Sequence, residues 1–241
     1  MVSSTKQLKR LSDEEFAEDI KKYIRSSHDF YGTKIPELKV LAKRLYEEYD
    51  LKSFYKVFNK FWNSGYHGER SLAIYTLEMY KDEFDTGTWN FIKIKLKDIK
   101  SWDKVDSVSI NILGEILMRE PVLEKEIISM ARSKNIWYKR MALMATIALV
   151  RNGNIRLAIH LCEENIHTNE ENIQKAVGMC LKEIGIQKPT VARRFILKNI
   201  KMPEKIFFIA TENMKDIRKL RQTRKESNFN FEKLMFWKGN E

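Results

Sequence analysis

Apolar residues recur along this chain with the spacing of helices, and four of the helical segments resemble one another. The segments are GERSLAIYTLEMY from Gly68, WDKVDSVSINILGEIL from Trp102, WYKRMALMATIALV from Trp137 and NIQKAVGMCLKEIG from Asn172. Each places a charged residue near the start of an apolar helix, and these residues, Arg70, Asp106, Arg140 and Lys175, follow one another at steps of 36, 34 and 35. A period in this range is typical of stacked helical hairpins, each too small to bury its apolar face alone.

The pattern therefore predicts an all-α fold, an α-solenoid of about a dozen helices with no strand. We expect one repeat domain over residues 1–226 and an aromatic C-terminal extension over residues 227–241, which contains FEKLMFW. The prolines fit the first turns of helices, where their missing N–H costs nothing. Three glycines are predicted to end helices in the left-handed conformation, namely Gly87, Gly153 and Gly185.

Composition supports a folded, reduced protein outside the membrane. Of the 241 residues, 43% are hydrophobic and 32% are charged, and no transmembrane run or apolar signal segment is apparent. The two cysteines, Cys162 and Cys180, both fall in helical patterns, which favours buried thiols over a disulfide. We expect a cytoplasmic protein. The four histidines have no metal-ligand spacing, so no metal site and no cofactor are predicted.

Positive charge is concentrated towards the C-terminus. The net charge is +11, and residues 188–225 hold 12 lysines and arginines against 3 acidic residues. A basic segment beside a helical groove attracts polyanions because it releases their counterions. A nucleic acid is therefore the expected partner, with a solvated basic face as the simpler alternative.

The most unusual stretch is KSWDKVD, which contains two candidate site residues. Trp102 and Asp106 are four residues apart and so share one face near a helix N-terminus. There the helix dipole stabilises a carboxylate. The structural alternative is that Asp103 or Asp106 caps the helix while Trp102 packs inside it.

Arg140 opens an almost wholly apolar helix, one repeat after Asp106. Such an arginine can extend outward, pair with a carboxylate, or face a groove that an anion can reach. An internal ion pair with Asp106 or Glu115 is the alternative to a role in binding.

With these residues in place, the chain resembles the AlkD-type family of alkylpurine DNA glycosylases, which are built from HEAT-like repeats. The resemblance covers roughly Phe16 to Arg194 and rests on four pieces in the family's order and spacing. These are YIRSSHDFYGTKIPELKVLAKRL, KSWDKVDSVS, IWYKRMAL and NIQKAVGMCLKEIG.

By position, the resemblance implies that Asp106 is the catalytic carboxylate and Trp102 the tryptophan beside the lesion. It implies DNA contacts for Tyr23 and Arg140 on a concave groove. Two positions depart from the family's pattern, since Met179 and Ser101 stand where the family has tryptophans. Further DNA-binding candidates are the basic residues Lys175, Arg193 and Arg194.

The resemblance implies a monofunctional DNA glycosylase that hydrolyses the N-glycosidic bond of cationic N3- or N7-alkylated purines in base excision repair. Its expected partner is duplex DNA with alkylated bases, which it would meet at the nucleoid as a monomer. Two alternatives stay open: a non-catalytic relative that recognises distorted or branched DNA, and a helical-repeat scaffold that binds a protein.

Overall fold

The computed structural model describes residues 2–219, and within them every regular element is helical. The predicted extension over residues 227–241 lies outside this range. The fourteen α-helices are α1 (Val2–Arg10), α2 (Glu14–Ile24), α3 (Ile35–Glu48), α4 (Leu51–Trp62), α5 (His67–Glu78), α6 (Thr86–Lys93), α7 (Trp102–Val108), α8 (Gly114–Arg119), α9 (Glu124–Ala131), α10 (Ile136–Arg151), α11 (Arg156–Asn165), α12 (Glu171–Gln187), α13 (Pro189–Lys198) and α14 (Glu204–Ala210). Short 3-10 turns η1 (Lys81–Glu83), η2 (Leu96–Asp98) and η4 (Pro121–Leu123) connect some of them.

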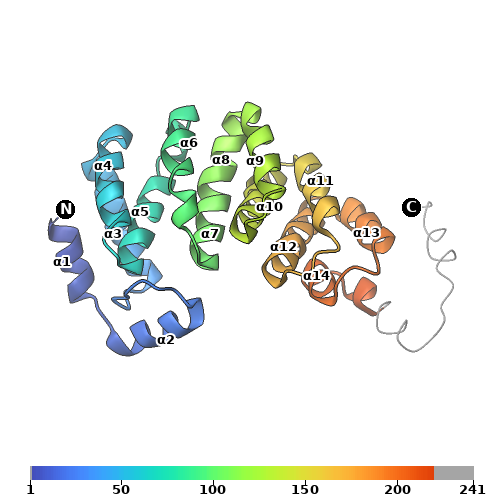
Figure 1. Ribbon diagram of the computed structural model, residues 1–241, viewed down its shortest axis with the longest axis horizontal. Coiled ribbons are helices and arrows are strands. Elements are labelled where there is room, and N and C mark those ends of the chain that lie inside the picture. The colour runs from blue at the N-terminus through green and yellow to red at the C-terminus, as the bar shows by residue number, and fades with distance from the viewer. Residues whose placement is uncertain (1, 220–241) are drawn as a thin grey trace.

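The helices stack in a curved row of pairs, which confirms the predicted helical-repeat fold (Figure 1). One layer contains α4, α6, α9, α11 and α13, and the inner layer contains α5, α7, α10, α12 and α14. Helix α2 lies beside the N-terminal end of the row, below the other helices in this view. Every residue of α10 from Arg140 to Val150 is buried, as expected of an inner helix that neighbours cover on all sides.

Helix α7 continues through one π-helical turn, η3 (Ser109–Leu113), into α8, so that residues 102–119 form one long helix. Gly114 follows this turn and lies directly against α10. A Cβ added there would meet the carbonyl oxygen of Ala145 and the Cβ of Ala148, each at 2.6 Å. The absence of a side chain thus lets the two inner helices approach closely.

Only one of the three predicted glycine caps is correct. Gly153 follows α10 with φ of 85°, as a left-handed cap should. Gly87 instead lies in the first turn of α6, and Gly185 lies within α12. Gly185 has a packing role, because a Cβ there would meet the terminal methyl group of Met214 at 2.6 Å.

The two thiols are free and buried, as predicted. Cys180 donates to the carbonyl oxygen of Leu143 at 3.2 Å, which ties α12 to α10. Within residues 2–219, no helix has both the length and the apolar character needed to cross a bilayer.

We predict that Gly114→Ala destabilises the protein by about 1–3 kcal/mol, because the new methyl group meets backbone and Cβ atoms that cannot move independently. The matched control is Gly185→Ala, whose new methyl group meets only the end of a flexible side chain. There the better helix propensity of alanine offsets the contact. Urea unfolding would compare the two, and equal losses would contradict the assigned close packing.

Candidate functional site

A groove of about 910 Å³ runs across the inner helices and collects most of the site residues predicted from the sequence. It contains the C-terminal end of α2, the N-terminal ends of α7, α10 and α12, and one residue of α14. Its lining comprises Lys22, Tyr23, Ile24, Arg25, Lys100, Ser101, Trp102, Asp106, Trp137, Arg140, Glu171, Asn172, Lys175, Met179 and Ile209. Three helix N-termini lie at this groove, and the positive ends of their dipoles favour anions.

Asp106 and Arg140 form a two-pronged ion pair at the wall of this groove. Arg140 Nε donates to Asp106 Oδ1 at 2.8 Å, and Nη2 donates to Oδ2 at 2.6 Å. The third nitrogen, Nη1, donates to the backbone oxygen of Asn172 at 2.6 Å. The Arg140 side chain is 3% exposed, whereas that of Asp106 is 15% exposed. Of the roles that the sequence left open for Arg140, the structure shows the internal ion pair.

This pair fixes the orientation of a buried carboxylate. Burial raises the pKa of Asp106 above its ordinary value, while the hydrogen bonds and charge of Arg140 oppose that shift. Because both oxygens accept from the same guanidinium fork, the carboxylate is held in one plane at the groove wall.

Aromatic rings line the same groove as the carboxylate. Tyr23, which is 70% exposed, meets Trp102 edge to face, with ring centroids 5.6 Å apart. Met179 also lines the groove, so the departure from the family's aromatic pattern falls within the site. Trp137 lines it as well, although the sequence analysis gave it no role. A signal was present, because Trp137 follows Trp102 by 35 residues, one repeat period.

The groove's positive charge comes mainly from residues that the charge distribution did not single out. Lys22, Arg25 and Lys100 line it, and all three lie outside the basic stretch of residues 188–225. Lys175 also lines it, and its ammonium group pairs with Glu171 at 2.9 Å.

Arg193 and Arg194 are not among the groove-lining residues. Arg193 pairs with Asp216, and Arg194 is exposed on α13. Other C-terminal cations also face acidic partners, as in the pairs Lys182–Glu212, Lys198–Glu163 and Lys205–Glu171. Within the described residues, much of the C-terminal basic charge is therefore balanced locally.

The sequence model of the family described as "DNA alkylation repair enzyme" matches residues 4–214. The chain belongs to this family. No match is found among curated proteins.

Solved structures share the fold at low identity. A predicted DNA alkylation repair enzyme from Enterococcus faecalis is 19% identical with a TM-score of 0.73, covering 84% of this chain and 96% of its own. AlkD2 from Streptococcus mutans is 15% identical with a TM-score of 0.57, covering 82% of this chain and 97% of its own. These similarities show that the chain shares its helical-repeat fold with both proteins.

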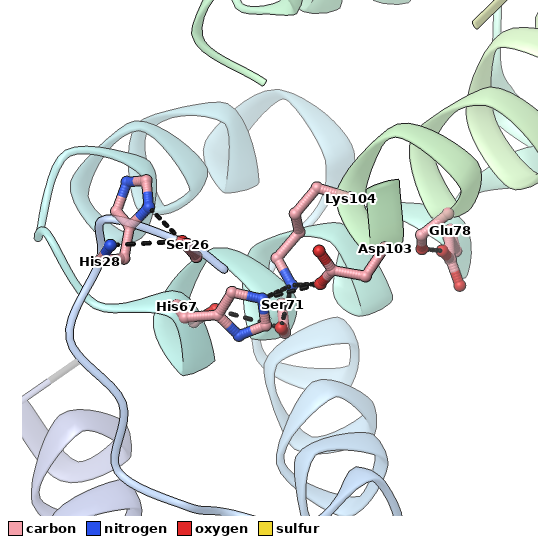
Figure 2. A network of polar contacts seen from close by, with 8 residues as sticks. Ser26, His28, His67, Ser71, Glu78, Asp103 and Lys104 are labelled. Carbon is pink, nitrogen blue, oxygen red and sulfur yellow. Dashed lines mark hydrogen bonds and ion pairs between the residues drawn. The ribbon is translucent and has the colours of Figure 1, made fainter. Parts of the chain in front are cut away.

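In this family member, a second polar cluster lies directly beneath the start of α7 (Figure 2). Asp103 Oδ2 accepts from His67 Nε2 at 2.7 Å and from Lys104 Nζ at 2.9 Å. Lys104 Nζ also donates to Ser71 Oγ at 2.6 Å. The cluster joins α5 to α7, and so it fixes the helix end that carries Trp102 and Asp106.

The structure decides whether the residues of KSWDKVD cap and pack the helix or line the groove. Neither Asp103 nor Asp106 caps α7, whose N-cap residue, Ser101, makes no side-chain cap bond. Trp102 is only partly buried and lines the groove. The carboxylates serve contacts between repeats instead, with α5 for Asp103 and with α10 for Asp106.

The cluster has a definite electrostatic state. Burial lowers the pKa of His67, against the opposing hydrogen bond with Asp103, so the ring is neutral in the fold at neutral pH. Burial alone would raise the pKa of Asp103, but the hydrogen bond from His67 and the charge of Lys104 outweigh it and hold that pKa well below its ordinary range. Within residues 2–219, no group of three or more His, Cys, Asp or Glu side chains could hold a metal ion.

We predict that the protein loses stability as the pH falls below about 6.5, because the unfolded chain protonates His67 more readily than the fold does. Asp103 acts at lower pH, because the stability that its ionised form contributes is lost as the pH drops below about 4. His67→Gln keeps an N–H donor without a titrating ring. It should reduce the loss between pH 7.5 and 5.5 by about 1 kcal/mol.

Urea unfolding at the two pH values checks this difference. The control is His160→Gln, because His160 lies exposed on α11. If His67→Gln lost as much stability between these two pH values as the wild type, the assignment of a neutral His67 ring would be wrong.

Proposed function

We propose that this protein is a DNA glycosylase that hydrolyses the N-glycosidic bond of cationic N3- or N7-alkylated purines in duplex DNA. The observation that carries the proposal is that Tyr23, Trp102 and Asp106 line one groove, in which a fixed carboxylate shares the wall with a pair of aromatic rings in contact. Its place in the DNA alkylation repair family supports DNA as the substrate. We propose further that it acts as a monomer at the nucleoid.

The proposed reaction does not depend on a general acid. An alkylated purine that carries a positive charge departs as a neutral base, so its leaving nitrogen needs no proton. The sugar, however, develops positive charge as the bond breaks, and a water must attack it. Asp106, which lines the groove and is partly exposed, would stabilise that charge and orient the water.

Arg140 would act on this step by positioning Asp106. Its fork holds both carboxylate oxygens, and its contact with Asn172 anchors it to the next repeat. The aromatic faces of Tyr23, Trp102 and Trp137 would attract the cationic base and sugar. The helix N-termini and the groove-lining cations Arg25 and Lys100 would contact backbone phosphates.

A second function is favoured by two specific features. The ion pair with Arg140 partly neutralises the charge of Asp106, and Met179 lacks the quadrupole through which an indole attracts a cation. A relative with these properties would bind distorted or branched DNA in the same groove without releasing a base.

We predict that the wild-type protein releases 3-methyladenine or 7-methylguanine from methylated duplex DNA and that Asp106→Asn does not, although it still binds the duplex. Chromatography of the released bases and a binding titration on the same DNA provide the two measurements. Binding by the wild type without base release would reject the glycosylase and select the second function.

A control is needed because Asp106→Asn leaves the buried Arg140 charge without its partner, which destabilises a fold. The double variant Asp106→Asn/Arg140→Gln removes both charges. We expect it to regain thermal stability while remaining inactive. If it regained activity as well, Asp106 would have no part in the chemistry.

Met179→Trp should raise the single-turnover excision rate about fivefold, because an aromatic face over a developing cation contributes about 1 kcal/mol. Met179→Leu is the matched control, since it keeps an apolar side chain of similar size without a ring. Equal rates for the two variants would show that ring electrostatics at this position are unimportant.

A further inference from the structure

A smaller pocket of about 170 Å³ opens beside the groove, between the end of α2, the end of α4 and the segment before α7. Arg25, Lys100 and Ser101 line both spaces, which are therefore contiguous. We call this space the side pocket and define it by Arg25, Ser27, Trp62, Arg70 and Lys100.

The side pocket is strongly cationic. Its lining includes the cations Arg25, Arg70 and Lys100 and one acidic residue, Asp98. Within residues 2–219, none of these three cations forms an ion pair. His28 also lines the pocket, and burial lowers its pKa, with a further lowering from the charge of Arg70.

Arg70 is held with its donors available to this pocket. Its guanidinium lies 4.7 Å from the centre of the Trp62 ring, and Nε donates to the Trp62 backbone oxygen at 2.8 Å. Its two Nη groups have no hydrogen-bond acceptor within the described residues. A guanidinium fixed by stacking and by one hydrogen bond loses little entropy when it binds an oxyanion through the remaining nitrogens.

Trp62 contributes a second, independent observation. Its indole Nε1 is buried, and no acceptor within residues 2–219 lies within hydrogen-bond distance. Buried N–H groups are almost always paired in folded proteins, because an unpaired donor costs about 1–3 kcal/mol. An oxyanion in the side pocket would provide acceptors for both this indole and Arg70.

We propose that the side pocket binds a backbone phosphate of the DNA strand that lies in the groove. This assignment rests on the proposed DNA-binding function. The donors of the side pocket require a ligand with the acceptor oxygens of a tetrahedral oxyanion. Contiguity with the groove favours a phosphate of the same strand over a free anion. Arg70 and Trp62, which do not line the groove itself, would thereby extend the DNA contact beyond the lesion site.

The first arm of the test uses inorganic phosphate and needs no DNA. The indole N–H signal of Trp62 is identified in a nitrogen–proton NMR spectrum as the signal that Trp62→Phe lacks. We expect phosphate to shift this signal saturably in the wild type, with a weaker or absent shift in Arg70→Gln. A signal that does not respond to phosphate would overturn the pocket, whatever the protein does with DNA.

The second arm measures duplex binding across a range of salt concentrations. Losing one phosphate contact should reduce the slope of log K against log salt by about 1 and weaken binding about tenfold. We expect this for Arg70→Gln. Lys97→Gln is the control of equal charge, since Lys97 is exposed and lines neither space, and it should leave the slope unchanged.

Ser27→Glu keeps the test decisive if Arg70→Gln fails to fold. Ser27 is exposed and lines only the side pocket, so the new carboxylate would repel phosphate without disturbing the core. Ser129→Glu on α9 adds the same charge away from both spaces. If phosphate binds but Ser27→Glu and Ser129→Glu weaken DNA binding equally, a DNA phosphate is excluded as the ligand. Absence of DNA binding in the wild type would overturn the proposed function and, with it, this assignment.

Discussion

The structure depends on one constraint, which is that no single helical hairpin of this chain can bury its own apolar face. The hairpins must stack, and stacking at a nearly constant period brings residues one repeat apart into contact. The resulting polar contacts follow that period closely. Asp106 meets Arg140 across 34 residues, and His67 meets Asp103 across 36.

Each of these two contacts fixes a different part of the site. The cluster of His67, Ser71, Asp103 and Lys104 ties the start of α7 to α5, while Arg140 ties Asp106 to α10 and, through Asn172, to α12. Four inner helices are thus aligned by charged groups next to the groove. Paired charges suit this task because their hydrogen bonds are directional, whereas apolar packing alone would leave each helix freer to rotate. The same pairing limits how much bare negative charge Asp106 can present.

Charge on the surface is arranged differently from charge along the sequence. The charge distribution along the sequence predicts the strongest polyanion site in the basic C-terminal stretch, yet Arg193, Lys198 and Lys205 face acidic partners on neighbouring elements. Among the described residues, the cations without such partners include Arg25, Arg70 and Lys100, which all lie outside that stretch. They gather where the end of α2 approaches the row of repeats. This placement gives the groove and the side pocket their common positive character.

The sequence by itself determined the helical fold, the repeat period and the shared helix face of Trp102 and Asp106, because these follow from local spacing and from the need to bury apolar residues. It also placed Tyr23, Arg140, Lys175 and Met179 at what the structure shows to be one groove. Only the tertiary structure decided that Arg140 is buried against Asp106, that Trp137 joins the groove, and that Gly185 serves packing and not a cap. These outcomes depend on which side chains meet across the stacked repeats, and a contact between helices leaves no signature in the spacing of either helix alone.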